Sequence, residues 1–209
     1  MESPQLLDPL TPTPLSQWPN DDAYMQGVLI DHDTMVTDFI HHPTIENSRL
    51  AHVDLTHMQA ERFEAADCVF THCDFANVDL SEAAFYRVVF DQCRFVGTNL
   101  AQLYAANVQF VDCQMSLVWA PEGTWKTVDF LRCRLDGGEF SHAQTAKFTL
   151  TDCAIDNLGL MGFSLKNLDL SSCEFKTLEL ELARMRGLTV TDTQASLLAT
   201  RYLGLHVVS

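Results

Sequence analysis

Large apolar side chains recur at every fifth position over most of this chain. The series includes Ile30, Leu50, Phe75 and Phe95 and continues to Val190 without an insertion. Its exceptions are small or weakly polar, namely Ala60, Ala65, Ala105, Ala120 and Thr145. An α-helix repeats every 3.6 residues and a strand every 2, so the spacing fits neither element alone.

A second period of twenty residues contains the period of five. It is marked by six cysteines, Cys73, Cys93, Cys113, Cys133, Cys153 and Cys173. Such an array predicts a solenoid in which each coil stacks on its neighbours. Four units of five residues per coil predict four sides, each pointing one large residue inward and a smaller one two positions earlier.

The repeated units resemble those of a known family. Cys73-Asp74-Phe75 and Thr98-Asn99-Leu100 are examples, and over roughly residues 28–193 the chain resembles pentapeptide-repeat proteins. The resemblance implies an all-β fold, a right-handed four-sided parallel β-helix. We expect this β-helix to occupy residues 24–192.

The two ends of the array have different compositions. Residues 1–23 hold five of the seven prolines and no apolar period, so we expect a mobile leader. At the other end, Asp192 is expected to cap a helix over 193–203 that stops at Gly204. We expect a short strand over 205–208, so that residues 193–209 close the rod.

Two further features concern the middle of the chain. Ala120 and Gly123 fill inward positions and predict a kink near 118–125. Trp119 falls on an outward position, where it is either an anchor for a partner or packed over the local turn.

The C-terminal segment resembles one subgroup of this family more specifically. Residues 194–198 and 203–205 are similar to the end of the quinolone-resistance pentapeptide-repeat proteins, in which the helix covers the last coil and joins two rods. This resemblance implies a homodimer through the C-terminal end. The predicted interface consists of Leu197, Leu198, Tyr202 and Leu203.

The cysteines are predicted to be core residues. Stacked thiols have parallel Cβ vectors, which disfavours disulfides, and a straight ladder cannot surround a zinc ion. Cys68 lies in the neighbouring inward position and has the same interpretation. Since the chain has no run of eighteen apolar residues and no signal-peptide pattern at its start, we expect a cytoplasmic protein.

The formal net charge is −15, and it is unevenly distributed. Residues 28–90 hold eleven acids and three arginines, a net charge of −8, whereas residues 91–193 have a net charge of −4. Three coils span about 15 Å, over which duplex DNA carries about nine charges. The N-terminal half therefore matches DNA in charge density. The candidate partner-binding residues are Asp54, Glu64, Asp74, Asp79 and, as an anchor, Trp119.

These charges lead to two functional hypotheses. An acidic rod does not bind nucleic acid directly. The family resemblance implies that it mimics DNA, occupies a groove of DNA gyrase or topoisomerase IV and so protects against quinolones. The alternative is an acidic scaffold or binding module for another protein, and the charge can also serve solubility alone.

Catalysis finds little support in the sequence. No nucleophile–base pair and no glycine-rich phosphate loop stand out, so we expect neither an enzyme nor a cofactor. His32, His52 and His72 share the twenty-residue register and should stack on one outer side. No carboxylate or thiol continues their column, so the sequence favours a solvated column and no metal site.

Overall fold

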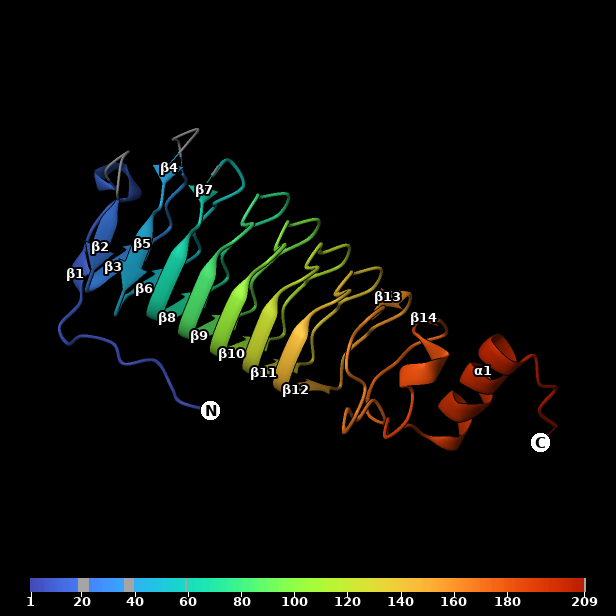
Figure 1. Ribbon diagram of the computed structural model, residues 1–209. Coiled ribbons are helices and arrows are strands. Elements are labelled where there is room, and N and C mark those ends of the chain that lie inside the picture. The colour runs from blue at the N-terminus through green and yellow to red at the C-terminus, as the bar shows by residue number, and fades with distance from the viewer. Residues whose placement is uncertain (19–22, 36–39, 59, 209) are drawn as a thin grey trace.

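The chain folds into a rod of stacked coils (Figure 1). The computed structural model describes residues 1–18, 23–35, 40–58 and 60–208. The strands are β1 (Thr11–Pro12), β2 (Tyr24–Gln26), β3 (Val28–Asp31), β4 (Ile40–His41), β5 (Thr44–Glu46), β6 (Arg49–Ala51), β7 (Ala60–Glu61), β8 (Glu64–Thr71), β9 (Ala84–Asp91), β10 (Tyr104–Val111), β11 (Thr124–Leu131), β12 (Gln144–Thr151), β13 (Leu158–Gly159) and β14 (Leu178–Glu179). Two 3-10 turns, η1 (Leu15–Gln17) and η2 (Leu182–Arg184), and one helix, α1 (Asp192–Leu203), complete the chain.

Residues twenty positions apart pair along the rod axis. The parallel main sheet has the order β1-β3-β6-β8-β9-β10-β11-β12, with β2 and β5 beside this path. Tyr104 pairs with Ala84 on one side and Thr124 on the other. The expected four-sided parallel β-helix is confirmed.

One coil, residues 73–92, defines the four sides that the other coils repeat every twenty residues. Side one is 73–77, side two 78–82, side three 83–87 and side four 88–92. Long strands such as β9 cover sides three and four. Sides one and two are linked along the axis by single parallel bridges.

The inward side chains form continuous aromatic columns. Phe75, Phe95, Phe110 and Phe130 are fully buried, as predicted. Neighbouring rings stack face to face, with 4.7 Å between the centroids of Phe75 and Phe95. Stacked rings at the coil spacing exclude water from the interior.

The coils turn through residues with left-handed backbone, each two positions after an inward residue. Arg87, Gln92 and Gln102, for example, have φ of 52°, 54° and 59°. Asn, Asp and His tolerate this conformation better than most residues, and all three types recur at these corners.

The cysteines are reduced and buried, as expected. The Sγ of Cys93 donates to the carbonyl oxygen of Phe70 at 3.5 Å, and Thr98, in an equivalent inward position, donates to Phe75 at 2.7 Å. Burial raises the pKa of Cys68 to about 12, so this thiol stays protonated at neutral pH. The thiols act as small core groups that satisfy backbone carbonyls.

The N-terminal segment covers the open end of the rod, and the expectation of a mobile leader is wrong for residues 1–18. β1 pairs with β3, and Leu15 and Trp18 are buried. The Trp18 ring meets Phe63 edge to face at 6.1 Å. An uncovered coil would expose apolar side chains and unpaired strand edges, and this segment shields them. Residues 19–22 and 36–39 lie outside the described residues.

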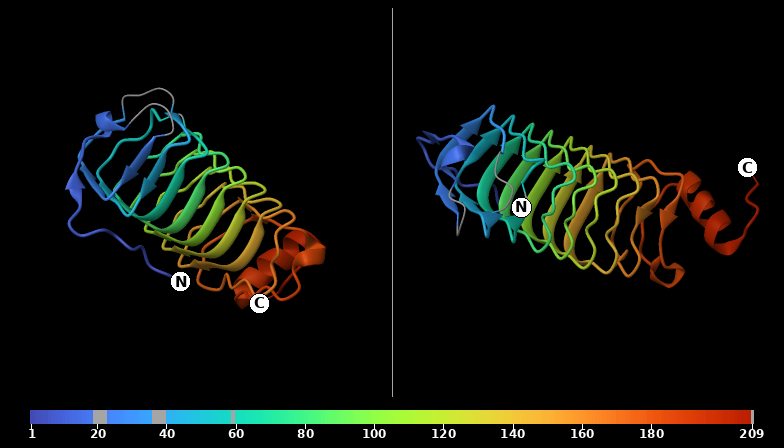
Figure 2. Two further views of the ribbon diagram at one scale, coloured as in Figure 1. Left: turned by 60° about the vertical axis from the view of Figure 1, so that its left-hand side comes forward. Right: turned by 90° about the horizontal axis from the view of Figure 1, so that it is seen from above.

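Residues before β1 run back along a corner of the rod (Figure 2). The amide of Gln5 donates to Asp67 at 3.0 Å, and that of Glu2 donates to Asn107 at 3.1 Å. Asp67 also pairs with Arg87 at 2.6 Å. The segment is thus attached to two coils of the rod, at Asp67 and at Asn107.

The kink expected near 118–125 is absent. β10, β11 and β12 keep their twenty-residue register on both sides of this segment. A Cβ at Gly123 would lie only 2.5 Å from Nε1 of Trp125, so the glycine makes room for the buried indole. A small residue beside a large one keeps the coil regular.

The helix α1 covers the other end of the rod, as Figures 1 and 2 show. Its cap is Thr191, whose hydroxyl accepts from the Gln194 amide at 3.2 Å, and not Asp192, which is already helical. Gly204, with φ of 65°, ends the helix as expected. Residues 205–208 form no strand, because they extend past the helix without a strand to pair with. Nowhere in the described chain is a helix long and apolar enough to cross a bilayer.

Candidate partner-binding surface

Side two carries an aromatic side chain among carboxylates. Parallel bridges connect Asp79, Asn99, Trp119 and Glu139 in one column along the rod. Glu122 lies in the adjacent corner column and accepts from Nε2 of Gln102 at 3.1 Å. We call Asp79, Trp119, Glu122 and Glu139 the acidic-aromatic patch.

Trp119 is the most conspicuous member of this patch. Its bridges hold the backbone in the coil, and about half of its surface (52%) is exposed. Its side chain therefore lies outward, and the other half of its surface is covered by neighbouring atoms. Whether it anchors a partner stays a prediction.

Side two is also the part of the rod with the fewest positive charges. From residue 78 to 182 this side holds six acids and no Lys or Arg. Three of the acids form ion pairs with arginines outside this range, Glu82 with Arg62 of the preceding coil, Glu181 with Arg184 and Glu179 with Arg201. Among the described residues, no such pair neutralises the three carboxylates of the patch.

The number of carboxylates per unit length of the patch is slightly lower than the number of phosphates on one DNA strand. The patch extends over three coil steps, about 14 Å, and one DNA strand carries about four charges over that length. Three acids lie within this span on one side of the rod. The comparison of charge density with DNA thus applies to one DNA strand and to side two of the rod.

Asp54 and Asp74 share a bridged column on side one. Asp54 accepts from the hydroxyl and amide of Thr56, which hold its pKa below the usual value. Asp74 pairs with Arg94 at 3.0 Å. Asp74 therefore has a cationic partner within the rod, whereas the donors to Asp54 come from the neutral Thr56.

The structure does not bring the four predicted acids onto one surface. Glu64 lies on side three and Asp79 on side two, where its carboxylate also accepts from the Ser81 amide at 3.0 Å. The high charge density of the N-terminal half is thus distributed around the rod. Glu122 and Glu139 were missed because the sequence comparison summed charge along the chain and not by side.

The C-terminal residues divide into two groups. Leu198 is buried, and the Tyr202 hydroxyl donates to the carbonyl oxygen of Leu178 at 2.7 Å, so both hold α1 on the last coil. Leu197 and Leu203 are exposed. Only the second pair is open to a partner.

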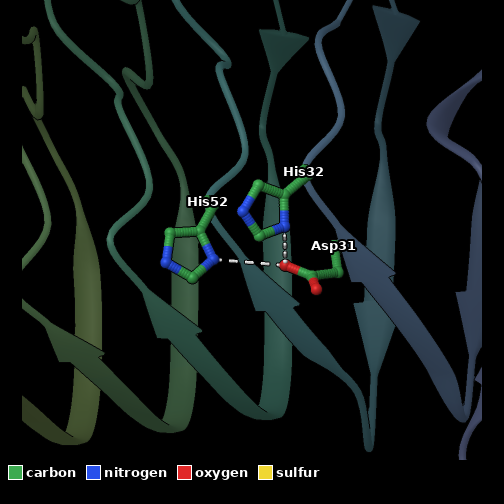
Figure 3. Close-up of side chains that lie close together, drawn as sticks. All are labelled: Asp31, His32 and His52. Carbon is green, nitrogen blue, oxygen red and sulfur yellow. Dashed lines mark hydrogen bonds and ion pairs between the residues drawn. The ribbon is translucent and has the colours of Figure 1, made fainter.

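The predicted histidine column is present on side four. The centroids of His32 and His52 are 4.3 Å apart, and those of His52 and His72 are 5.0 Å apart. Figure 3 shows that Asp31 joins the first two rings. The sequence search missed this carboxylate because it followed the histidine column alone, whereas Asp31 precedes His32 in the chain.

A family model and several solved structures are similar to parts of this chain. Residues 83–160 match a family model described as a pentapeptide repeat region. No curated protein matches. Among solved structures, two trypsin-treated forms of QnrB1, a plasmid-mediated fluoroquinolone resistance protein, are 16% identical to this chain and cover 90% of it. The alignments cover 100% and 98% of the two QnrB1 chains, with TM-scores of 0.46 and 0.49, respectively. HetL, a pentapeptide repeat protein involved in heterocyst differentiation regulation in Nostoc sp. strain PCC 7120, is 13% identical over 82% of this chain and 93% of its own, with a TM-score of 0.39. Similarity this low carries no argument about function.

Proposed function

We propose that this chain is a non-enzymatic interaction protein that inserts its acidic-aromatic patch into a protein groove that binds DNA. Residues 83–160 of the chain match a pentapeptide repeat region. The observation that supports this proposal is a set of three carboxylates around an exposed Trp119, which form no ion pair within the described part of the chain. A bacterial type II topoisomerase, DNA gyrase or topoisomerase IV, is the proposed partner. Occupation of the topoisomerase's DNA groove by this chain would protect the enzyme against quinolones.

The patch combines two contributions to binding. The carboxylates attract a basic groove over a distance, which raises the association rate and makes it salt-dependent. The indole of Trp119 supplies a large apolar surface that a pocket can desolvate, as binding hot spots do. The resemblance of residues 194–198 and 203–205 to the quinolone-resistance members favours a topoisomerase over other proteins with DNA grooves.

The test removes charge and keeps the turns. In the patch variant, Asp79→Asn, Glu122→Gln and Glu139→Gln each retain an oxygen that can accept the existing hydrogen bond. The control variant carries Asp91→Asn, Asp129→Asn and Asp152→Asn, which remove the same charge from side four, opposite the patch. We expect wild type and control to inhibit gyrase supercoiling equally, and the patch variant to need at least ten-fold more protein.

Salt provides the second condition of this experiment. Raising the ionic strength should weaken inhibition by the wild type more than by the patch variant, because three charges are lost from the contact. Equal inhibition by patch and control variants would overturn the role of the patch. No effect of the wild type on supercoiling or quinolone sensitivity at micromolar concentration would overturn the topoisomerase and leave the alternative, an acidic binding module for another protein.

A further inference from the structure

Asp31, His32 and His52 converge on one point of side four (Figure 3). Oδ1 of Asp31 lies 2.8 Å from Nδ1 of His32 and 3.2 Å from Nδ1 of His52. One ligand atom from each of the three residues lies within 4.8 Å of the others. Two successive coils thus contribute to a single cluster.

The solenoid itself holds these donors in register. His32 and His52 occupy equivalent left-handed corners, with φ of 51° and 53°, so their side chains leave the backbone in the same direction. The rings stack with an angle of 20° between their planes. The side chains of Asp31, His32 and His52 are 52%, 72% and 46% exposed, which leaves room for ring rotation and for water molecules.

Two imidazoles and a carboxylate are a donor set for zinc and related transition-metal ions. Ligands at about 2.0–2.1 Å from a tetrahedral ion lie about 3.3 Å from one another, close to the separations in this cluster. Calcium and magnesium prefer oxygen donors alone. We propose that Asp31, His32 and His52 bind a divalent ion of the zinc class, with water completing its coordination.

The charge state of the cluster suits a cation. Oδ1 of Asp31 is the acceptor that both imidazoles face, so the cluster presents a carboxylate between two ring nitrogens. In the absence of an ion, an Nδ1 proton on either ring can be donated to Asp31. An ion takes the place of these protons, and the rings then carry their proton on Nε2.

The site is confined to the first two coils. Later coils place Ala51 and Thr71 where Asp31 stands, so His72 continues the ring stack without a carboxylate before it. His72 therefore offers a control in the same column, at the same kind of corner. An ion at Asp31 would link two coils near the N-terminal end of the rod.

The experiment titrates the full chain with Zn²⁺ by calorimetry and with Co²⁺ by visible absorption. We expect one ion per chain, at least ten-fold weaker binding in Asp31→Asn and in His52→Asn, and unchanged binding in His72→Asn. Asparagine is chosen because it tolerates the left-handed corner and keeps the coil intact, which circular dichroism would check.

The near-ultraviolet and visible absorption spectrum of the cobalt-bound protein distinguishes this site from the seven thiols. Cobalt bound to nitrogen and oxygen lacks the intense near-ultraviolet charge-transfer bands of cobalt thiolates. Binding with those bands, equal affinity in His52→Asn and His72→Asn, or no saturable binding up to millimolar ion would each overturn the proposal. Its outcome is independent of topoisomerase binding, since the patch lies on the opposite side.

Discussion

Phe95 shows how a single side chain supports two adjacent coils. It is fully buried, stacks on Phe75 with 5° between the ring planes, and meets Phe90 and Phe110 edge to face. Phe95 therefore contacts rings of its own coil and of the preceding coil. The polar counterpart is Thr98, whose buried hydroxyl satisfies the Phe75 carbonyl of the preceding coil.

We expect Phe95→Ala to reduce the free energy of unfolding by about 3–5 kcal/mol, through lost burial and the cavity left in a rigid stack. Urea unfolding followed by circular dichroism measures this change. Tyr86→Ala removes an exposed ring on the neighbouring coil side and should cost much less. Equal losses for both variants would contradict a core dominated by the aromatic column.

At the scale of elements, α1 is a lid held by polar as well as apolar contacts. The buried Gln194 completes a capping box with Thr191 through its Oε1 and backbone amide. Its Nε2 donates to the carbonyl oxygens of Leu170 at 2.9 Å and Cys173 at 2.8 Å. These carbonyls belong to the end of the rod, where no further coil supplies amides.

Gln194→Ala would leave both carbonyls without this donor under the helix. We expect a loss of about 1–3 kcal/mol in the free energy of unfolding, since the Cys173 carbonyl loses this buried donor, whereas the Leu170 carbonyl still accepts from the Cys173 amide at 2.9 Å. Ser196→Ala removes a hydroxyl on the exposed face of the same helix and should change stability by less than about 0.5 kcal/mol. Amide hydrogen exchange should also increase in α1 of the first variant; unaltered exchange there would contradict the docking role.

At the scale of the whole molecule, the two ends of the rod differ. The N-terminal end is covered by residues 1–18, whereas α1 and the residues after it expose apolar side chains at the other end. The exposed set comprises Leu197, Leu203, Leu205, Val207 and Val208. Two-fold pairing would cover them and would leave side two of each rod accessible.

We therefore expect a homodimer through the C-terminal end. Leu197→Asp combined with Leu203→Asp should convert it to a monomer in sedimentation at micromolar concentration, because charges would be buried in the interface. Met161→Asp, at an exposed residue of side two, should leave the dimer unchanged. A monomeric wild type would refute the prediction.

The sequence by itself determined the period, the inward residues and the stacking of coils, because a strict spacing of five can bury its large side chains in only one repeating way. It likewise placed the aromatic column and the buried cysteines. The helix could be predicted from its composition, but its cap was one residue off, because the extended backbone that lets the Thr191 hydroxyl reach the Gln194 amide depends on how the last coil ends.

Only the tertiary structure decided which charges share a side and which segments cover the ends. Asp54, Glu64, Asp74 and Asp79 are all outward, yet the coil distributes them over three sides and gives Asp74 an arginine from the next coil. Leu15 and Trp18 follow no period, since they fit the end of a column already formed by other residues. Asp31 meets His52 only because twenty residues close one coil, a contact that depends on side-chain direction in three dimensions as well as on spacing.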